Sequence, residues 1–218
     1  MLFVLSDEHI FPHPSLASGE GLLAIGGDLS PERLLLAYRY GIFPWYNAGD
    51  PILWWSPDPR LVLFPEEIKV SKSMRSYFRK DIFRWTWNTC FTDVMEACGE
   101  VLRPDQSGET WITGEMTEAY TRLHEMGYAH SLEVWMEGQL AGGLYGVRVG
   151  NVFYGESMFH LVPNASKFAL ITLAKEAPSE GICLIDCQQD TPHLRSLGAR
   201  TIPRDDFLKL LRENTRAF

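Results

Sequence analysis

The polar residues best suited to chemistry lie on one short apolar segment near the C-terminus. Residues 183–188 read CLIDCQ, a pattern that predicts a buried strand. Side chains alternate along a strand, so Asp186 and Gln188 should share a face, where the Asp can accept a hydrogen bond from the Gln amide NH2. The Gln carbonyl oxygen would then point outward and could hold an amine while that amine attacks an ester. A polar pair at a solvated strand end is the plain alternative, and the strand alone does not decide between the two.

A further carboxylate, Glu156, lies in the segment GESMF at residues 155–159, near the end of another expected strand. Between a glycine and an apolar patch, it can bind the positive end of a substrate or hold an amine. The alternative is a surface Glu paired with a nearby lysine, which stabilises a protein only weakly. Functional side chains often gather near strand ends, so we expect Glu156 to join Asp186 and Gln188 as the catalytic group.

Positive charge is concentrated between residues 69 and 84, although the chain as a whole has a net charge of −8. Lys72, Arg75 and Arg79 have the spacing of one helix face, and Lys80 follows directly. Such a face can track the phosphate backbone of a nucleic acid, whereas the net charge argues against extensive coating by one. A solvated helix face is the commoner explanation of such a run.

Aromatic residues gather between positions 43 and 55, among Pro, Gly and Asp residues that make a helix unfavourable. We interpret this segment as an ordered aromatic loop. Trp45, Tyr46, Trp54 and Trp55 could stack on an exposed base. Most such rings pack one domain on another, so we expect stacking from one or two of them.

Several site classes find no support in the sequence. The four cysteines, at positions 90, 98, 183 and 187, form neither a disulfide-rich pattern nor a metal-binding CxxC spacing, and a buried thiol is expected at Cys187. The six histidines lack metal-ligand spacing, and no glycine pair belongs to a nucleotide-binding fingerprint. No apolar run is long enough to cross a membrane. The cysteine pattern fits a reduced, cytoplasmic setting, and neither a metal nor a cofactor is expected. A monomer is taken as the default.

The expected elements form an α+β fold with a largely antiparallel sheet, in a small N-terminal domain (residues 1–60) and a larger domain (residues 61–218). Two prolines, at positions 57 and 59, suggest the boundary. Helices are expected at residues 31–40, 70–80, 91–98, from 114 onward, at 164–177 and after Pro203. Strands are expected at residues 61–64, 83–87, 130–136, 139–148, 152–158 and 183–188.

Long segments of the chain resemble the bacterial leucyl/phenylalanyl-tRNA–protein transferase family. The matching stretches include GLLAIGGDLSPERLLLAY, GIFPW, GDPILWWSPDPR, YGESMF, NASK, LIDCQ and SLGA, in family order from Gly21 to Ala199. The resemblance implies an acyl-CoA N-acyltransferase-like catalytic domain behind a small N-terminal one. It also implies transfer of Leu or Phe, with Met as a further candidate, from tRNA to proteins beginning with Arg or Lys, which marks them for N-end-rule degradation.

The resemblance also assigns roles to particular residues. The catalytic polar groups are Asp186, Gln188 and Glu156. The helix spacing of the basic run, and not the resemblance, is what suggests that the phosphate backbone of tRNA would meet Lys72, Arg75, Arg79 and Lys80. The residues expected to bind the aminoacyl end are Trp45, Trp111, Tyr120, Leu144, Phe153, Met158, Leu170 and Ile185. Position 144 departs from the family, in which Met is expected. Residues 189–191 read QDT and lack an Asn that could contact the acceptor peptide.

Two other functions compete with this interpretation. One is an acyl-CoA-dependent N-acyltransferase, against which the sequence lacks a glycine-rich Q/RxxGxG/A loop for the pyrophosphate. The other is a tRNA-binding module without catalysis, which leaves the grouping of Asp186, Gln188 and Glu156 without a purpose. An aminoacyl ester is already activated, so transfer from tRNA would need neither ATP nor a metal.

Overall fold

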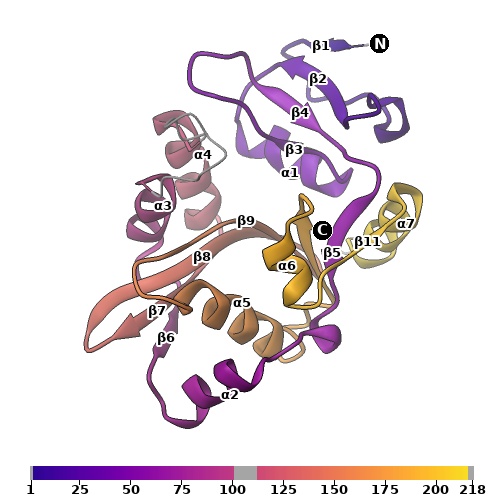
Figure 1. The fold of residues 1–218 in the computed structure, drawn as a ribbon. Coiled ribbons are helices and arrows are strands. Elements are labelled where there is room, and N and C mark those ends of the chain that lie inside the picture. Colours follow the sequence, from indigo (N-terminus) through magenta and orange to yellow (C-terminus); the bar gives the residue numbers. More distant parts are fainter. Residues whose placement is uncertain (1, 101–111, 216–218) are drawn as a thin grey trace.

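The computed structural model describes residues 2–100 and 112–215, whose strands form two sheets (Figure 1). The N-terminal sheet has the order β1-β2-β4-β3, in which only β1 and β2 are parallel. The helix α1 (Pro31–Arg39) begins at Ser30, whose hydroxyl accepts a hydrogen bond from the Arg33 backbone NH. The strands of this sheet are β1 (Phe3–Leu5), β2 (Leu22–Gly26), β3 (Phe43–Pro44) and β4 (Leu53–Trp55).

The large sheet has seven strands in the order β11-β5-β10-β9-β8-β7-β6, and only β9 and β10 run parallel. Between β7 and β8, Glu137 and Gly138 both have positive φ, as a two-residue hairpin turn requires. The expected turn between β8 and β9 has Gly150 at φ +61°. The strands are β5 (Arg60–Leu63), β6 (Arg84–Trp87), β7 (Ala129–Met136), β8 (Gln139–Val149), β9 (Val152–His160), β10 (Leu184–Gln188) and β11 (Arg200–Ile202).

Helices cover both faces of the large sheet, and the central strands are therefore buried on both sides (Figure 1). On β9, Phe153 faces the core beneath α5, while its neighbour Tyr154 faces the core shared with α1, α3, α4 and α7. Gly142 lets α5 approach β8 closely, because a Cβ there would lie 2.6 Å from the Ala165 side chain. The helices are α2 (Lys72–Arg79), α3 (Phe91–Glu100), α4 (Gly114–Glu125), α5 (Ala165–Glu176), α6 (Pro192–Ser196) and α7 (Arg204–Asn214), with short 3-10 turns at Pro14–Leu16 and Pro65–Glu67.

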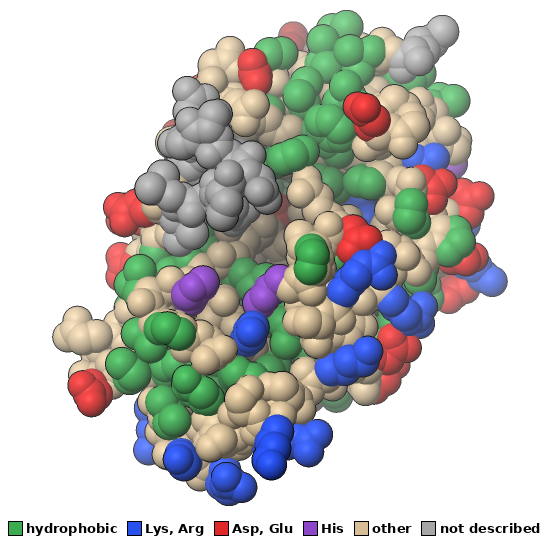
Figure 2. Space-filling model, viewed as in Figure 1, with side chains coloured by type: hydrophobic (Ala, Val, Ile, Leu, Met, Phe, Trp, Pro, Cys, Tyr) green, Lys and Arg blue, Asp and Glu red, His purple; other side chains and the backbone are tan. Residues whose placement is uncertain are grey.

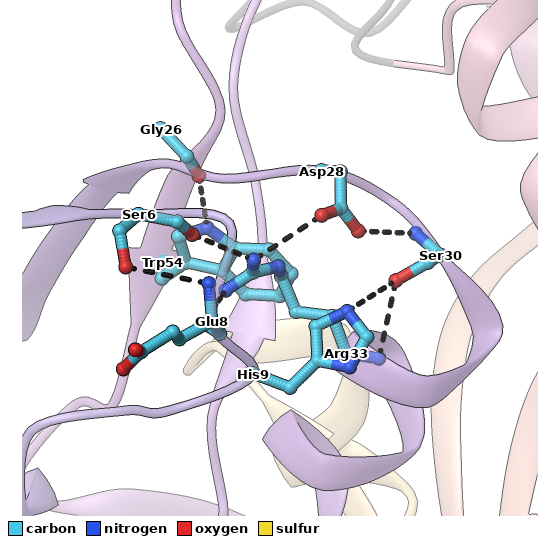
Figure 3. A network of polar contacts seen from close by, with 8 residues as sticks. All are labelled: Ser6, Glu8, His9, Gly26, Asp28, Ser30, Arg33 and Trp54. Carbon is cyan, nitrogen blue, oxygen red and sulfur yellow. Dashed lines mark hydrogen bonds and ion pairs between the residues drawn. The ribbon is translucent and has the colours of Figure 1, made fainter.

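The N-terminal sheet is held to α1 by the buried guanidinium of Arg33 (Figure 3). Arg33 donates to the backbone oxygens of Ser6 and Glu8 at 2.8 and 3.2 Å, and to the Asp28 carboxylate at 3.2 Å. Burial raises the pKa of Asp28, but hydrogen bonds from Ser30 and the charge of Arg33 outweigh it and lower that pKa to about 2. This network has no signal in the sequence, because the oxygens that accept from Arg33 are mostly backbone oxygens.

The predicted α+β class, with a small N-terminal part and a largely antiparallel main sheet, is confirmed. The segment 43–55 was interpreted as an ordered aromatic loop, but its two ends pair with each other as the strands β3 and β4. One apolar core joins α1 and Trp54 to α3, α4 and α7 across the proposed boundary at residue 60, so the division into 1–60 and 61–218 stays a prediction. Within the described residues, no helix has the length and apolar character needed to cross a membrane.

Candidate active site

An apolar pocket of about 500 Å³ opens between β3, the middle of the large sheet, α5 and α6. Its floor comes from neighbouring strands, because Leu144 on β8 pairs with Met158 on β9, and Phe153 on β9 pairs with Ile185 on β10. Leu170 completes it from α5. The five aliphatic and aromatic residues that the sequence analysis assigned to the aminoacyl end are thus brought together in one cavity, large enough for an apolar side chain.

Trp45 forms part of the pocket wall beside Phe43 and Pro44. Its backbone oxygen accepts a hydrogen bond of 2.7 Å from the Trp55 indole, and the two rings lie 5.7 Å apart. Tyr46 and Trp54 are buried in the core, so of the four aromatic residues considered for stacking these two pack the interior instead. Trp111 lies outside the described residues.

Glu156 and Gln188 both line the pocket and meet there from the adjacent strands β9 and β10. The Gln188 amide Nε2 donates to Glu156 Oε1 at 3.0 Å. Asp186 was expected to accept this hydrogen bond, and that expectation is wrong. The carboxylate that accepts from the Gln188 amide belongs to Glu156. Because the NH2 faces a carboxylate, the Gln188 carbonyl oxygen remains free to accept a hydrogen bond from an amine.

Asp186 is completely buried and does not line the pocket. Its two oxygens accept hydrogen bonds from Arg60 Nε at 2.8 Å and from Nη2 at 2.6 Å, and Oδ1 also accepts from the Gln188 backbone NH at 2.9 Å. The Arg60 guanidinium lies between the rings of Phe43 and Phe207, 4.7 Å from each centroid. Asp186 therefore acts on Gln188 through its backbone rather than through its side chain.

A bulge explains why alternation along β10 fails at the site. Asp186 pairs with Val62 and Gln188 pairs with the adjacent Leu61, so Cys187 is the extra residue. Gln188 has φ +60°, a conformation uncommon for a residue with a side chain. This backbone turns Gln188 toward the pocket, whereas Asp186 faces the opposite core. The expectation that the two share a face is therefore wrong.

Two buried tyrosines support Glu156 from behind. The Tyr120 hydroxyl donates to Glu156 Oε2 at 3.3 Å, and the Tyr38 hydroxyl forms a short contact with that of Tyr120. Burial raises the pKa of Glu156 to about 7; the neighbouring Asp186 charge acts in the same direction, and hydrogen bonds from Tyr38, Gln188 and Tyr120 oppose the rise. Glu156 can therefore change its charge near neutral pH. Tyr120, expected at the aminoacyl end, lies behind Glu156 and does not line the pocket.

The pocket also has polar walls that the sequence analysis missed. His160 and Ser166 lie on one side, and Thr191 and His193 lie at the start of α6. Burial lowers the pKa of His193, and the charges of Lys167 and His160 lower it further. Isolated histidines and hydroxyls carry no spacing signal in the sequence, and only the fold brings these together.

Cys187 lines the pocket, but burial and the Asp186 charge raise the pKa of its thiol well above the ordinary value. A thiolate nucleophile is therefore unfavourable here, in agreement with the expected structural thiol. Across residues 2–100 and 112–215, no group of three or more His, Cys, Asp or Glu side chains has the arrangement of a metal site.

The basic residues Lys72, Arg75, Arg79 and Lys80 are all exposed on α2 or directly after it. Met74 is buried on the opposite side of this helix, which fixes the direction of the basic face. Figure 2 shows Lys and Arg side chains gathered at the lower edge of the molecule, over α2. The helix lies outside the pocket, so its residues would contact a large ligand at a distance from the reacting atoms.

Comparison with known proteins identifies the family. A model described as leucyl/phenylalanyl-tRNA protein transferase matches residues 62–212, and a model of the N-terminal domain of the same transferases matches residues 27–58. The chain belongs to this family. Leucyl/phenylalanyl-tRNA–protein transferases of Syntrophobacter fumaroxidans and Nitrosospira multiformis are 58% and 56% identical to it. The alignments cover 98% and 96% of this chain and 91% and 90% of the relatives.

Solved structures are much more distant from this transferase-family chain. A GCN5-related N-acetyltransferase from Kribbella flavida is 11% identical with a TM-score of 0.41, covering 82% of this chain and 63% of the other. A structure of L-PGS from Bacillus licheniformis is 10% identical with a TM-score of 0.44, covering 75% and 51%. The function is therefore inferred from the transferase family and from the site, and the resemblance found in the sequence is confirmed.

Proposed function

We propose that this protein is an aminoacyltransferase that moves leucine, phenylalanine or methionine from aminoacyl-tRNA to the N-terminal Arg or Lys of an acceptor protein. The observation that carries this proposal is the hydrogen-bonded Gln188–Glu156 pair in the lining of an apolar pocket. The pocket suits the side chain of the transferred amino acid. The polar pair lies where the ester and the attacking amine would meet.

The Gln188 carbonyl oxygen would accept a hydrogen bond from the acceptor amine and aim its lone pair at the ester carbonyl carbon. An α-amino group has a pKa of about 8, so an appreciable fraction is neutral near pH 7. The new C–N bond forms as the C–O bond to the tRNA ribose breaks. The amine proton passes, by way of water or a neighbouring tRNA hydroxyl, to the released ribose oxygen. Glu156 supplies negative potential as positive charge develops on the amine.

Asp186 and Arg60 would contribute by position. Their buried pair fixes the backbone of the bulge through the Gln188 NH, and so fixes the direction of the Gln188 side chain. Reaction rates depend steeply on such alignment. We therefore regard Asp186 as a positioning residue, and we assign the contact with the amine to Gln188.

The exposed basic face of α2 would bind the tRNA backbone, and Trp45 would pack against the aminoacyl end at the pocket wall. Because these substrates are cytoplasmic, we propose that the protein acts in the cytoplasm, as a monomer. Its products would there enter N-end-rule degradation. An acyl-CoA-dependent N-acyltransferase remains the competing activity.

Transfer of labelled leucine from Leu-tRNA separates these functions. The acceptors are two forms of one protein, beginning with Arg or with Met, and acetyl-CoA replaces Leu-tRNA in a parallel reaction. Label on the Arg protein alone supports the proposed activity. Acetylation from acetyl-CoA without leucine transfer would favour the competing activity, and tRNA binding without turnover would favour a binding module.

A further inference from the structure

A second cavity, of about 270 Å³, lies beside the apolar pocket. It is bounded by Glu20, the rings of Trp45 and Trp55, the prolines of the segment 57–59, and residues 188–190. It therefore lies between the N-terminal sheet and the segment that joins β10 to α6.

The two cavities share a wall at Gln188 and Trp45, since both residues line each of them. This junction matters because the α-amine and the first side chain of an acceptor protein are attached to the same carbon atom. If Gln188 holds the amine, the first side chain must lie next to Gln188. The apolar pocket is then occupied by the transferred amino acid, which leaves the second cavity for the first side chain of the acceptor.

The charge of the second cavity is negative. Glu20 and Asp190 line it, and no Lys, Arg or His does so among the described residues. Asp190 is already paired with Arg195 through two hydrogen bonds. Glu20 is exposed and, within the described ranges, no cation pairs with it. The Trp45 and Trp55 rings offer π faces that attract a cation.

Glu20 is held in place by a tight turn. The backbone NH of Gly21 donates to the Ser18 oxygen at 2.9 Å, and the Ser56 NH donates to the Gly21 oxygen at 2.7 Å. Gly21 has φ +97°, and a Cβ there would lie 2.7 Å from the Pro57 Cα. The turn therefore packs directly against the wall of the cavity and fixes the backbone that carries Glu20 beside it.

We propose that this second cavity binds the cationic first side chain of the acceptor protein, with Glu20 as the residue that selects for its charge. Asp190, with its charge shared with Arg195, adds a weaker attraction, and the Trp45 and Trp55 rings contact the aliphatic stem. Glu156 is left to serve the α-amine. The proposal rests on the proposed function and specifies where its acceptor is recognised.

The test uses two acceptor peptides that differ only in the first residue, arginine or citrulline, which have nearly the same shape but differ in charge. The Michaelis constant for each peptide is measured at saturating Leu-tRNA for the wild type, Glu20→Gln and Glu20→Gln/Asp190→Asn. Glu213→Gln, on the exposed surface of α7, makes the same change in net charge and serves as the control. The Michaelis constant for Leu-tRNA is measured with each variant.

The wild type should use the arginine peptide with a Michaelis constant about tenfold or more below that of the citrulline peptide. Glu20→Gln should raise the value for arginine about tenfold, leave citrulline and Leu-tRNA unchanged, and so remove most of the discrimination; Glu213→Gln should change nothing. Unaltered discrimination in both the single and the double variant would overturn the proposal while leaving the transfer activity standing. Absence of transfer by the folded wild type to any peptide would overturn the proposed function, and the acceptor site with it.

Discussion

Replacing Glu156 by Gln should change how the folding stability of the protein depends on pH. The carboxylate is 8% exposed, is fixed by Gln188 and Tyr120, and has its pKa raised from 4.5 to about 7, chiefly by burial. Between these two pH values the unfolded chain has released the proton while the folded chain retains it. The free energy of unfolding of the wild type therefore falls as pH rises through this range.

The size of the effect follows from the size of the shift. One pKa unit corresponds to about 1.4 kcal/mol, so the ionisation of Glu156 should cost the wild type about 3 kcal/mol of stability above pH 7 and nothing below pH 4.5. Gln cannot ionise, so the Glu156→Gln variant lacks this loss. Its free energy of unfolding, relative to that of the wild type, should rise by about 3 kcal/mol between pH 4.5 and pH 8.

Urea unfolding followed by tryptophan fluorescence at several pH values from 4.5 to 8.5 measures this difference. A hydrogen bond weakened by the substitution changes the free energy of unfolding of Glu156→Gln by the same amount at every pH. This constant change cancels when the difference between variant and wild type at one pH is subtracted from the difference at another pH. Glu213→Gln is the matched control, because it removes one exposed carboxylate far from the pocket lining. If the difference between wild type and Glu156→Gln stays the same across the whole range, the assignment of a raised pKa to this carboxylate is refuted.

Three further predictions concern the surroundings of the site. Arg60→Met should lower the free energy of unfolding, measured by urea unfolding, by about 3–5 kcal/mol, because it leaves the Asp186 carboxylate buried without its partner. Adding Asp186→Asn removes the unpaired charge and should restore part of this loss. If the double variant recovers no stability, the loss does not come from the unpaired charge. Leu170→Trp should fill the apolar pocket and raise the Michaelis constant for Phe-tRNA more than that for Leu-tRNA, with that for the acceptor unchanged. Arg75→Glu/Arg79→Glu should raise the Michaelis constant for aminoacyl-tRNA. When the logarithm of this constant is plotted against the logarithm of the salt concentration, the slope should be smaller by about 2 than for the wild type, because two phosphate contacts are lost. An unchanged slope would mean that tRNA binds elsewhere.

Much of the site could be predicted because its residues lie in long, regular strands. The pattern of residues 130–160 indicates the hairpin at residue 150, and this hairpin brings the strands of Leu144 and Met158 side by side. The exact pairing of these two residues also needs a register shift between Tyr145 and Gly146, for which the sequence has no signal. The family resemblance then selected the pocket residues from many apolar ones. Phe153, Ile185 and Leu170 were found in this way, and all of them line the cavity.

The other features of the site could not be predicted, because they depend on irregular backbone or on contacts between residues far apart in the sequence. The bulge at Cys187 inserts one residue without any sequence signal, and it reverses the direction expected for Gln188. Arg60 stands 126 positions from Asp186 in a proline-rich stretch that otherwise indicates a boundary. Tyr120 was expected at the aminoacyl end, but its hydroxyl donates to Glu156 from the core, an arrangement that only three-dimensional packing reveals.

The central claim is that the Gln188 side chain holds the attacking amine, and single-turnover transfer tests it most directly. Pre-bound Leu-tRNA is mixed with a saturating Arg-starting peptide, and the rate of peptide-bond formation is compared between wild type and Gln188→Ala, with circular dichroism to confirm that both are folded. The account predicts a rate about 100-fold lower for Gln188→Ala, with unchanged binding of Leu-tRNA. A folded Gln188→Ala enzyme that transfers leucine at the wild-type rate would contradict it.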